Sequence, residues 1–311
     1  MRLLLPNTRF FLPTALMGAA FCLLTALPLA GGPLIDRLRE RVGEGRAPSE
    51  TKGGPVEMSY GSDPLQKLDY WRPTAAGSPL VVFVHGGGWK RGDKRTATGE
   101  QKPGHFLQQG YGFASINYRL VPGCTVEQQA QDVAAALAFL FQQAESLGFD
   151  PGRVVLMGHS AGAHLSALVG TDMQYLKKAG LGPQSLRGVV PIDGACYDVP
   201  RQVAQGGELM RDTYTEAFGR GEERQRELSP THHADAPNAP AFLLLHVQRA
   251  DGTAQARALG DALQKAGTPA EVRGFEGGGL RGHTEINRRL GDPDYPATRV
   301  VDEWLRRVFA Q

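Results

Sequence analysis

The amino-acid sequence predicts an α/β fold with a mostly parallel central sheet, flanking helices and a small helical cap. Three observations lead to this prediction. From residue 56 onward, short runs rich in β-forming residues alternate with longer runs of helical periodicity. Several of the short runs are apolar at every position, as expected of strands buried on both faces. One long segment, Asp193–Asp235, interrupts the alternation with polar and irregular sequence.

Each expected element follows from its local pattern. We expect strands, all short and largely apolar, at Pro79–His85, Gly112–Tyr118, Arg153–Gly158, Leu186–Ile192, Ala241–His246 and Ala270–Phe275. We expect helices where apolar residues recur at helical spacing, at Thr125–Leu147, Thr253–Ala266 and Thr298–Phe309.

The interruption at about 193–235 is interpreted as the cap. The alternative is a long surface connection, but structureless loops of that length are uncommon in compact domains. Ligands of open α/β sheets bind outside the carboxyl ends of the strands, where a helical insertion would cover them. As a cap, this segment is small and heavily charged, and it includes the run GRGEERQRE.

The N-terminal residues 1–30 are interpreted as a signal peptide or membrane anchor. Arg2 and Arg9 form a basic stretch, and an uncharged, mostly apolar run from Phe10 to Ala30 follows it, which is the pattern of an export signal. We therefore expect an exported protein, periplasmic or secreted, with membrane attachment only if this segment stays uncleaved. Residues 31–55 are rich in Gly, Pro and charge and are interpreted as a linker, so the domain covers 56–311.

Charge and cysteine content exclude several function classes. The formal net charge of the 311 residues is +2, and no Lys/Arg cluster interleaved with aromatic residues suggests a nucleic-acid partner. Apart from Cys22, only Cys124 and Cys196 are present, and we expect them not to pair. No Cys/His spacing predicts a zinc site. We expect no metal and no cofactor.

Gly158-His159-Ser160-Ala161-Gly162 matches the pattern G-x-S-x-G between an expected strand and a probable helix. A serine on so tight a strand-to-helix turn is lifted clear of the sheet, and flanking glycines let neighbouring chains approach without a Cβ clash. The helix N-terminus favours negative charge that develops nearby. We predict Ser160 as a nucleophile.

The run His85-Gly86-Gly87-Gly88-Trp89 follows directly on a buried strand. Acyl transfer places charge on a carbonyl oxygen, and backbone N–H groups must already point at that oxygen. We predict that Gly87 and Gly88, with Ala161, form the oxyanion hole. Trp89 is predicted to line the substrate pocket or, alternatively, to pack beneath the loop.

A serine hydroxyl needs a base, and His283 is the predicted base because it lies late, in a glycine-rich loop able to reach the sheet edge. Asp251 follows a strand and opens a helix, so we predict that it orients the imidazole. Asp261 and Glu276 are the rival acids. The order Ser, Asp, His along the chain is the order known for the G-x-S-x-G motif.

These motifs resemble the α/β-hydrolase-fold esterases that carry HGGG, a group that includes hormone-sensitive-lipase-like, feruloyl-esterase-like and kynurenine-formamidase-like enzymes. The resemblance rests on YGSDPLQKLDYWRP, HGGGWKRGDK, INYRL, GHSAGAHLSAL, the turn at Asp251 and GHTEIN. It implies the α/β-hydrolase fold and a Ser-Asp-His triad, and it says much less about the substrate.

The sequence therefore predicts a serine esterase that cleaves small to medium carboxylic esters through an acyl-enzyme intermediate. An arylformamidase or amidase that uses the same residues is the alternative enzyme. An inactive hydrolase fold that only binds ligands is the remaining alternative. The expected partner is a small-molecule ester substrate.

Overall fold

The computed structural model describes residues 54–311, apart from the side chains of Glu208 and Leu209. The predicted signal peptide or anchor and nearly all of the predicted linker lie outside the described residues. The described residues, 54–311, belong to one compact unit.

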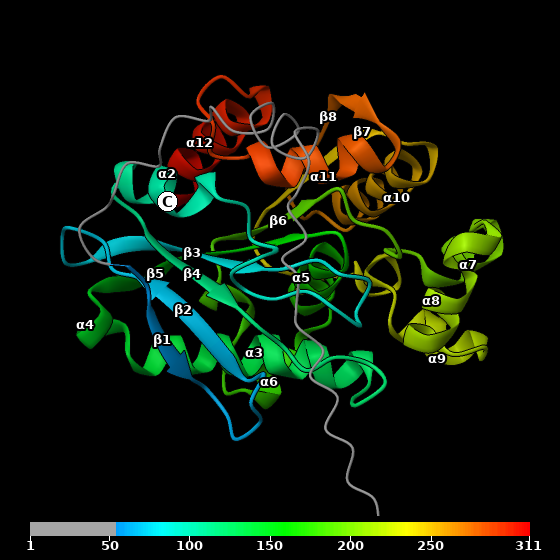
Figure 1. Cartoon of the computed structure of the whole chain (residues 1–311), viewed down its shortest axis with the longest axis horizontal. Coiled ribbons are helices and arrows are strands. Elements are labelled where there is room, and N and C mark those ends of the chain that lie inside the picture. Colours follow the sequence, from blue (N-terminus) through cyan, green and yellow to red (C-terminus); the bar gives the residue numbers. More distant parts are fainter. Residues whose placement is uncertain (1–53) are drawn as a thin grey trace, which may run out of the picture. The chain divides into compact units, whose positions relative to one another are not determined.

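One sheet of eight strands forms the centre of this unit (Figure 1). The strands are β1 (Val56–Ser59), β2 (Lys67–Trp71), β3 (Ser78–Val84), β4 (Gly112–Ile116), β5 (Phe149–His159), β6 (Gly188–Ile192), β7 (Phe242–Gln248) and β8 (Ala270–Gly278). Their order across the sheet is β1-β2-β4-β3-β5-β6-β7-β8. The β1–β2 and β2–β4 pairs are antiparallel, and every other pair is parallel.

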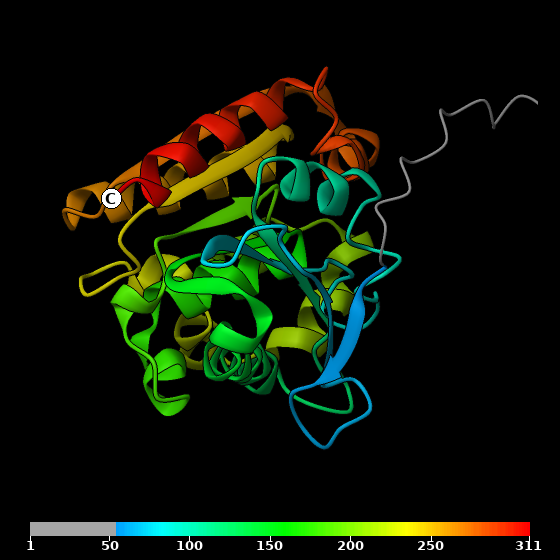
Figure 2. The same cartoon turned by 90° about the vertical axis from the view of Figure 1, so that its left-hand side faces the viewer.

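Helices cover both faces of the sheet. They are α2 (Gln101–Gln108), α3 (Val126–Gln142), α4 (Ala144–Leu147), α5 (Ala161–Thr171), α6 (Met173–Lys178), α7 (Val199–Gln205), α8 (Glu208–Phe218), α9 (Glu222–Glu227), α10 (Ala250–Lys265), α11 (Gly279–Arg289) and α12 (Pro296–Phe309), with short 3₁₀ turns at Pro183–Ser185 and Pro230–His233. Residues of α3, α5 and α10 belong to one apolar core, and residues of α2, α11 and α12 belong to the other. Figure 2 shows α12 (red) and α3 (green) on opposite sides of the sheet.

The apolar pattern explains the central strands. Every residue of β3, β4 and β6 is buried, as two covered faces require. The six expected strands are confirmed, with ends displaced by a few residues. The structure adds β1, which forms one edge of the sheet, and β2 beside it, both in antiparallel pairs. β1 is short and largely exposed, and β2 is short and includes the charged Lys67 and Asp69, so neither has a continuous apolar run.

The segment predicted as a cap contains three short helices, α7, α8 and α9. In Figure 1 these helices (yellow-green) lie together at one end of the sheet. Apolar residues of the segment face inward, since Tyr214 and Phe218 are buried in the same core as α3 and α5. Met210 is exposed.

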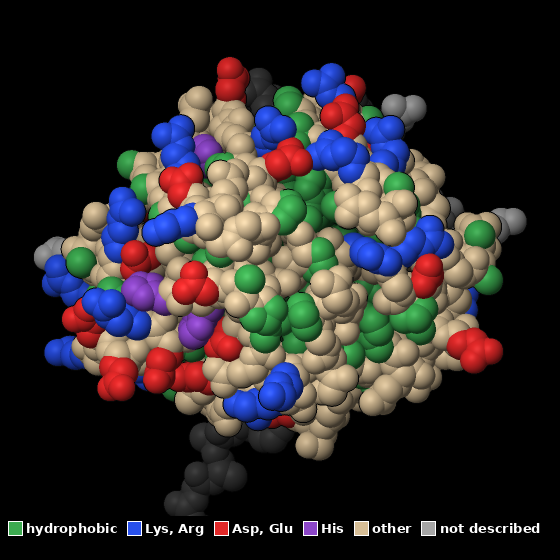
Figure 3. All heavy atoms as spheres, turned by 180° about the vertical axis from the view of Figure 1, so that it is seen from behind, with side chains coloured by type: hydrophobic (Ala, Val, Ile, Leu, Met, Phe, Trp, Pro, Cys, Tyr) green, Lys and Arg blue, Asp and Glu red, His purple; other side chains and the backbone are tan. Residues whose placement is uncertain are grey.

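The surface carries mixed charge. On the face shown in Figure 3, Lys and Arg side chains alternate with Asp and Glu, and neither sign gathers into one field. Within residues 54–311, no helix combines the length and the apolar character that crossing a membrane requires.

Candidate active site

Ser160 lies between the end of β5 and the first residue of α5, as the motif predicts. Its backbone is strained, with φ of 57° and ψ of −118°, a region that L-residues rarely occupy. A Cβ at Gly158 would lie 2.2 Å from the carbonyl oxygen of Gly162, and one at Gly162 would lie 2.2 Å from that of Val84. Both positions therefore require glycine, which allows the turn that exposes the hydroxyl.

The imidazole of His283 contacts Ser160, because Nε2 lies 3.0 Å from Oγ. The expectation that His283 lies in a flexible loop is wrong: it belongs to helix α11, which follows β8 directly. The run of glycines before it forms the end of β8 and the start of this helix, where Gly277 and Gly279 have positive φ. A short polar helix after several glycines gives a weak helical signal, which explains the error.

The carboxylate beside His283 belongs to Asp193, and not to Asp251 as the sequence predicted. Oδ2 of Asp193 lies 2.6 Å from Nδ1 of His283. Asp193 is fully buried and follows β6 directly, and its Oδ1 accepts a hydrogen bond of 3.0 Å from the backbone N–H of Val247. Asp193 has a φ of 44°, so this residue too adopts a strained conformation at the strand end.

Asp251 is directed elsewhere. Its carboxylate lies 3.2 Å from Nη2 of Arg249 and 3.3 Å from Nε2 of Gln202. Since Arg249 occupies the position between Asp251 and the imidazole, the structure does not bring Asp251 to His283. The rival acids Asp261 and Glu276 are both exposed and form no described contact with His283.

The acid after β6 could have been found from the sequence. Asp193 directly follows the apolar strand β6, and Asp251 lies soon after the apolar strand β7. The two strand ends lie at the same edge of a parallel sheet. In the sequence analysis Asp193 appears only as the first residue of the cap segment. Arg249 was missed because an arginine offers no nucleophile, base or acid.

The three residues predicted for the oxyanion hole line one cavity with Ser160. Gly87 and Gly88 have φ of 138° and 60°, and a Cβ at Gly87 would lie 1.9 Å from the carbonyl oxygen of Arg91. Within the described residues, the N–H groups of Gly87 and Gly88 have no backbone acceptor. Ala161 is the first residue of α5, where an N–H group has no partner within the helix.

Trp89 both lines the cavity and packs beneath the loop. It is 3% exposed, and its Nε1–H donates to Nδ1 of His164 at 3.3 Å. Its ring lies 4.7 Å from that of Phe218 and 6.2 Å from that of Tyr214, measured between centroids. The tryptophan thus joins the glycine loop to helix α8 of the cap segment.

The cavity has a volume of about 900 Å³ and contains both the serine and the imidazole. Its apolar wall includes Trp89, Met210, Tyr214 and Leu280, while Lys90, Arg91 and Arg249 contribute positive charge. Lys90 is paired with Glu216 at 2.7 Å. A cavity of this size takes a small or medium-sized organic molecule.

Two further histidines support the site as neutral groups. Burial holds the pKa of His159 well below its usual range, and the neighbouring His283 lowers this pKa further. Nε2 of His159 lies 2.9 Å from the backbone oxygen of His283. Burial also lowers the pKa of His164 to about 4, and Nε2 of His164 donates to the backbone oxygen of Leu228. Both rings therefore act as hydrogen-bonding supports near pH 7.

Within residues 54–311, no group of three or more His, Cys, Asp or Glu side chains is arranged to hold a metal ion.

The chain is similar in sequence to a protein family and to several esterases. A family model described as BD-FAE matches residues 68–254. Esterase LipC of Mycobacterium tuberculosis (strain ATCC 25618 / H37Rv) is 34% identical over 203 residues, which are 61% of this chain and 49% of LipC. A probable isoprenylcysteine alpha-carbonyl methylesterase of Oryza sativa subsp. japonica is 30% identical over 246 residues, 73% of this chain and 56% of that protein. The chain thus spans about half the length of the curated relatives it matches.

Solved structures confirm the fold class. Esterase B from Lactobacillus Rhamnosis superposes with a TM-score of 0.68 at 22% identity, over 89% of this chain and 90% of that chain. A truncated carbohydrate esterase from gut microbiota gives 0.66 at 21% identity, over 86% and 100%. The predicted resemblance to α/β-hydrolase-fold esterases is confirmed, and since the family model covers more than half of the sequence, the chain belongs to the BD-FAE family of α/β-hydrolases.

Proposed function

We propose that this protein is a carboxylic ester hydrolase in which Ser160, His283 and Asp193 form the catalytic triad. The observation that carries the proposal is the continuous series of contacts from Oγ of Ser160 to Nε2 of His283, and from Nδ1 of His283 to Asp193. The similarity to the esterase LipC and to a probable methylesterase of Oryza sativa supports it.

The geometry defines the role of each group. Nε2 of His283 takes the proton of Ser160 while Oγ attacks the ester carbonyl carbon, and Asp193 stabilises the imidazolium that forms. The negative carbonyl oxygen is stabilised by N–H groups of Gly87, Gly88 and Ala161. The imidazolium then gives its proton to the leaving alcohol, which leaves an acyl group on Ser160. A water molecule, deprotonated by His283, releases the acid and restores the serine.

The cavity supports small to medium esters as substrates. Its volume of about 900 Å³ exceeds that of a short acyl chain and leaves space for an aryl or alcohol group. The apolar wall is limited, and charged side chains stand beside it. Each buried CH₂ gains about 0.8 kcal/mol only where apolar surface receives it, so long acyl chains gain little here.

A labelling experiment tests the proposed nucleophile. A fluorophosphonate probe should modify the protein, and mass spectrometry of the digest should place the adduct on Ser160. Ser160→Ala should be unlabelled and should lose activity on p-nitrophenyl acetate by several orders of magnitude. Ser166→Ala is the matched control, because Ser166 is a buried serine of α5, the helix that follows Ser160. This variant should still be labelled on Ser160. An adduct on another serine would refute the assignment.

The substrate class is tested with a parallel panel of p-nitrophenyl esters, methyl ferulate and N-formylkynurenine. Turnover of the esters alone would support the proposal. Preferential turnover of the formamide would replace the esterase by an arylformamidase that uses the same residues. A folded, labelled protein that turns over none of them would contradict the proposed substrate class.

We further propose that residues 1–30 direct export, with the mature protein periplasmic or secreted. The proposal rests on the basic residues Arg2 and Arg9 and on the apolar run after them. N-terminal sequencing of the protein isolated from cell fractions tests it. An intact N-terminus in the cytosolic fraction would refute it.

A further inference from the structure

Arg249 lies beside the charged pair of the proposed triad. Its Nη1 is 3.2 Å from Oδ2 of Asp193 and 2.8 Å from Nδ1 of His283. On its other side, Nη2 and Nε lie 3.2 and 3.3 Å from the carboxylate of Asp251. The arginine side chain is 13% exposed, whereas that of Asp193 is fully buried. One guanidinium therefore connects two carboxylates, and only one of them touches the imidazole.

Whether Nδ1 of His283 carries a hydrogen decides which of these contacts are hydrogen bonds. In the productive arrangement Nε2 accepts the serine proton, so Nδ1 carries a hydrogen and donates it to Asp193. Nη1 of Arg249 then cannot donate to Nδ1, and it donates to Oδ2 of Asp193 instead. The cation remains within 3 Å of the ring, where it opposes a second proton on the imidazole.

We propose that Arg249 is a positioning residue of the triad: it anchors the buried carboxylate of Asp193 and opposes protonation of the Asp193–His283 pair, and Asp251 moderates this effect. The inference rests on the proposed function. Its consequence is an enzyme whose base stays free at lower pH than it would without the arginine. Asp251 thus acts on the triad through Arg249, although it does not touch His283.

The other groups around the imidazole do not supply this charge. From β5, the ring of His159 lies 4.5 Å from that of His283 between centroids, and its lowered pKa makes it neutral. The buried Lys102 of α2 contacts Asn287 of α11 rather than the ring. Arg249 is therefore the cation in contact with the pair among the described residues.

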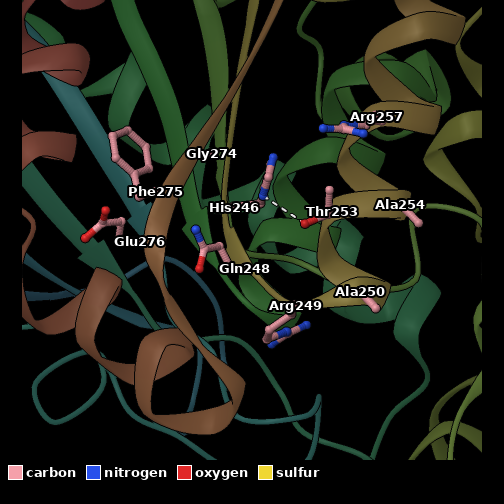
Figure 4. Close-up of a pocket in the computed structure, with 10 residues that line it drawn as sticks. All are labelled: His246, Gln248, Arg249, Ala250, Thr253, Ala254, Arg257, Gly274, Phe275 and Glu276. Atoms are coloured by element: carbon pink, nitrogen blue, oxygen red, sulfur yellow. Dashed lines mark hydrogen bonds between the residues drawn. The ribbon is translucent and has the colours of Figure 1, made fainter.

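A second cavity, of about 620 Å³, lies on the far side of Arg249 (Figure 4). It is open to solvent and is lined by residues of β7, β8 and α10, among them His246, Thr253, Arg257 and Glu276. Gln248, Arg249 and Ala250 line both this cavity and the one that contains Ser160. Because Arg249 lines both cavities, we expect a small cation to reach the space that its head group leaves when the arginine is replaced.

The test compares the pH dependence of kcat/KM, whose acid limb reports protonation of the essential base in the free enzyme. Arg249→Met should move the acid limb to higher pH by about one unit. Asp251→Asn, which leaves the arginine uncompensated, should move the limb to lower pH by a smaller amount. Arg249→Lys, which retains a charge, should fall between Arg249→Met and the wild type. Arg257→Met is the matched control, because Arg257 lines only the second cavity, and its profile should stay unchanged.

Chemical rescue gives a second readout. Millimolar guanidinium should restore the wild-type acid limb in Arg249→Met and should leave the wild type and Arg257→Met unaffected. If Arg249→Met does not fold, the opposite shifts in Arg249→Lys and Asp251→Asn still decide the question. Unchanged limbs, or shifts of Arg249→Met and Asp251→Asn in the same direction, would overturn the inference. Those outcomes leave labelling of Ser160 intact, whereas failure of the proposed function removes the labelling itself.

Discussion

Oδ2 of Asp193 lies 2.6 Å from Nδ1 of His283, although 90 residues separate them in the chain. The contact exists because β6 and β8 run parallel in one sheet, so that the residues after each strand meet at the same edge. Asp193 directly follows β6, the strand next to β5, and His283 lies in the helix that follows β8. The strand order therefore brings the acid and the base together at the sheet edge where Ser160 lies.

Asp193→Asn should fold and should lower kcat/KM by about three to four orders of magnitude, because an amide favours the wrong tautomer of His283. Asp251→Asn, measured at the pH optimum, should lower it much less. Steady-state kinetics on p-nitrophenyl acetate provide the measurement. Equal, large losses in the two variants would restore Asp251 as the orienting acid.

Gly162→Ala should prevent formation of the serine turn. The added Cβ would lie 2.2 Å from the backbone oxygen of Val84, and neither strand nor helix can move away without disrupting the core. We expect loss of soluble protein or a decrease of several degrees in Tm. Gly104→Ala, in α2 with open space around the added Cβ, is the control and should be neutral or slightly stabilising.

The free energy of unfolding should decrease as the pH falls below neutral. Burial lowers the pKa of His164 from 6.5 to about 4, so the unfolded chain binds a proton there that the folded chain does not bind. Stability supplied by the neutral ring is complete above about pH 6.5 and is lost as the pH falls toward 4, by up to about 3 kcal/mol.

Urea denaturation of His164→Gln at pH 7.0 and 4.5 tests whether His164 causes this pH dependence of stability. The variant should be less stable than the wild type at pH 7.0, and the difference should shrink at pH 4.5. His232→Gln, which changes an exposed histidine, should follow the wild type at both pH values. A constant difference between His164→Gln and the wild type would show that His164 does not contribute to the pH dependence.

A series of p-nitrophenyl esters should show the highest kcat/KM between roughly two and six acyl carbons. Beyond that length, further CH₂ groups meet charged side chains or solvent and gain less than the roughly 0.8 kcal/mol of full burial. The series is measured below the critical micelle concentration of each ester. A maximum at ten carbons or more would contradict the substrate size read from the cavity.

The sequence predicted the parts of the fold that are governed by local pattern. Strands buried on both faces are apolar throughout, and the six expected strands are present for that reason. The edge strand β1 was not predicted, because short exposed strands carry no such apolar pattern. Helix α11 was not predicted, because it is polar and begins among glycines. Its residues favour a helix only when they pack against β7 and β8.

The site was predictable in part for a related reason. Ser160 and the glycines after β3 lie in contiguous motifs, so their spacing alone places them together. Assigning the acid required a choice between strand ends that are adjacent in space and far apart in sequence. Asp251 stands near one of these ends and Asp193 directly after another, and only the positions of Arg249 and His283 show which carboxylate reaches the ring.

Helix α11 makes His283 a preorganised base. One turn after the histidine, Oδ1 of Asn287 accepts a hydrogen bond of 2.9 Å from Nζ of Lys102. Lys102 is fully buried, and its Nζ also donates to the backbone oxygen of Thr98 at 2.7 Å. Nδ2 of Asn287 donates to the backbone oxygen of Ala97 at 3.0 Å. The conformational entropy of the histidine is therefore lost once, when the chain folds, and not again in each catalytic cycle. A base carried on a mobile loop would have to be ordered each time a substrate binds, whereas His283 is already oriented before binding.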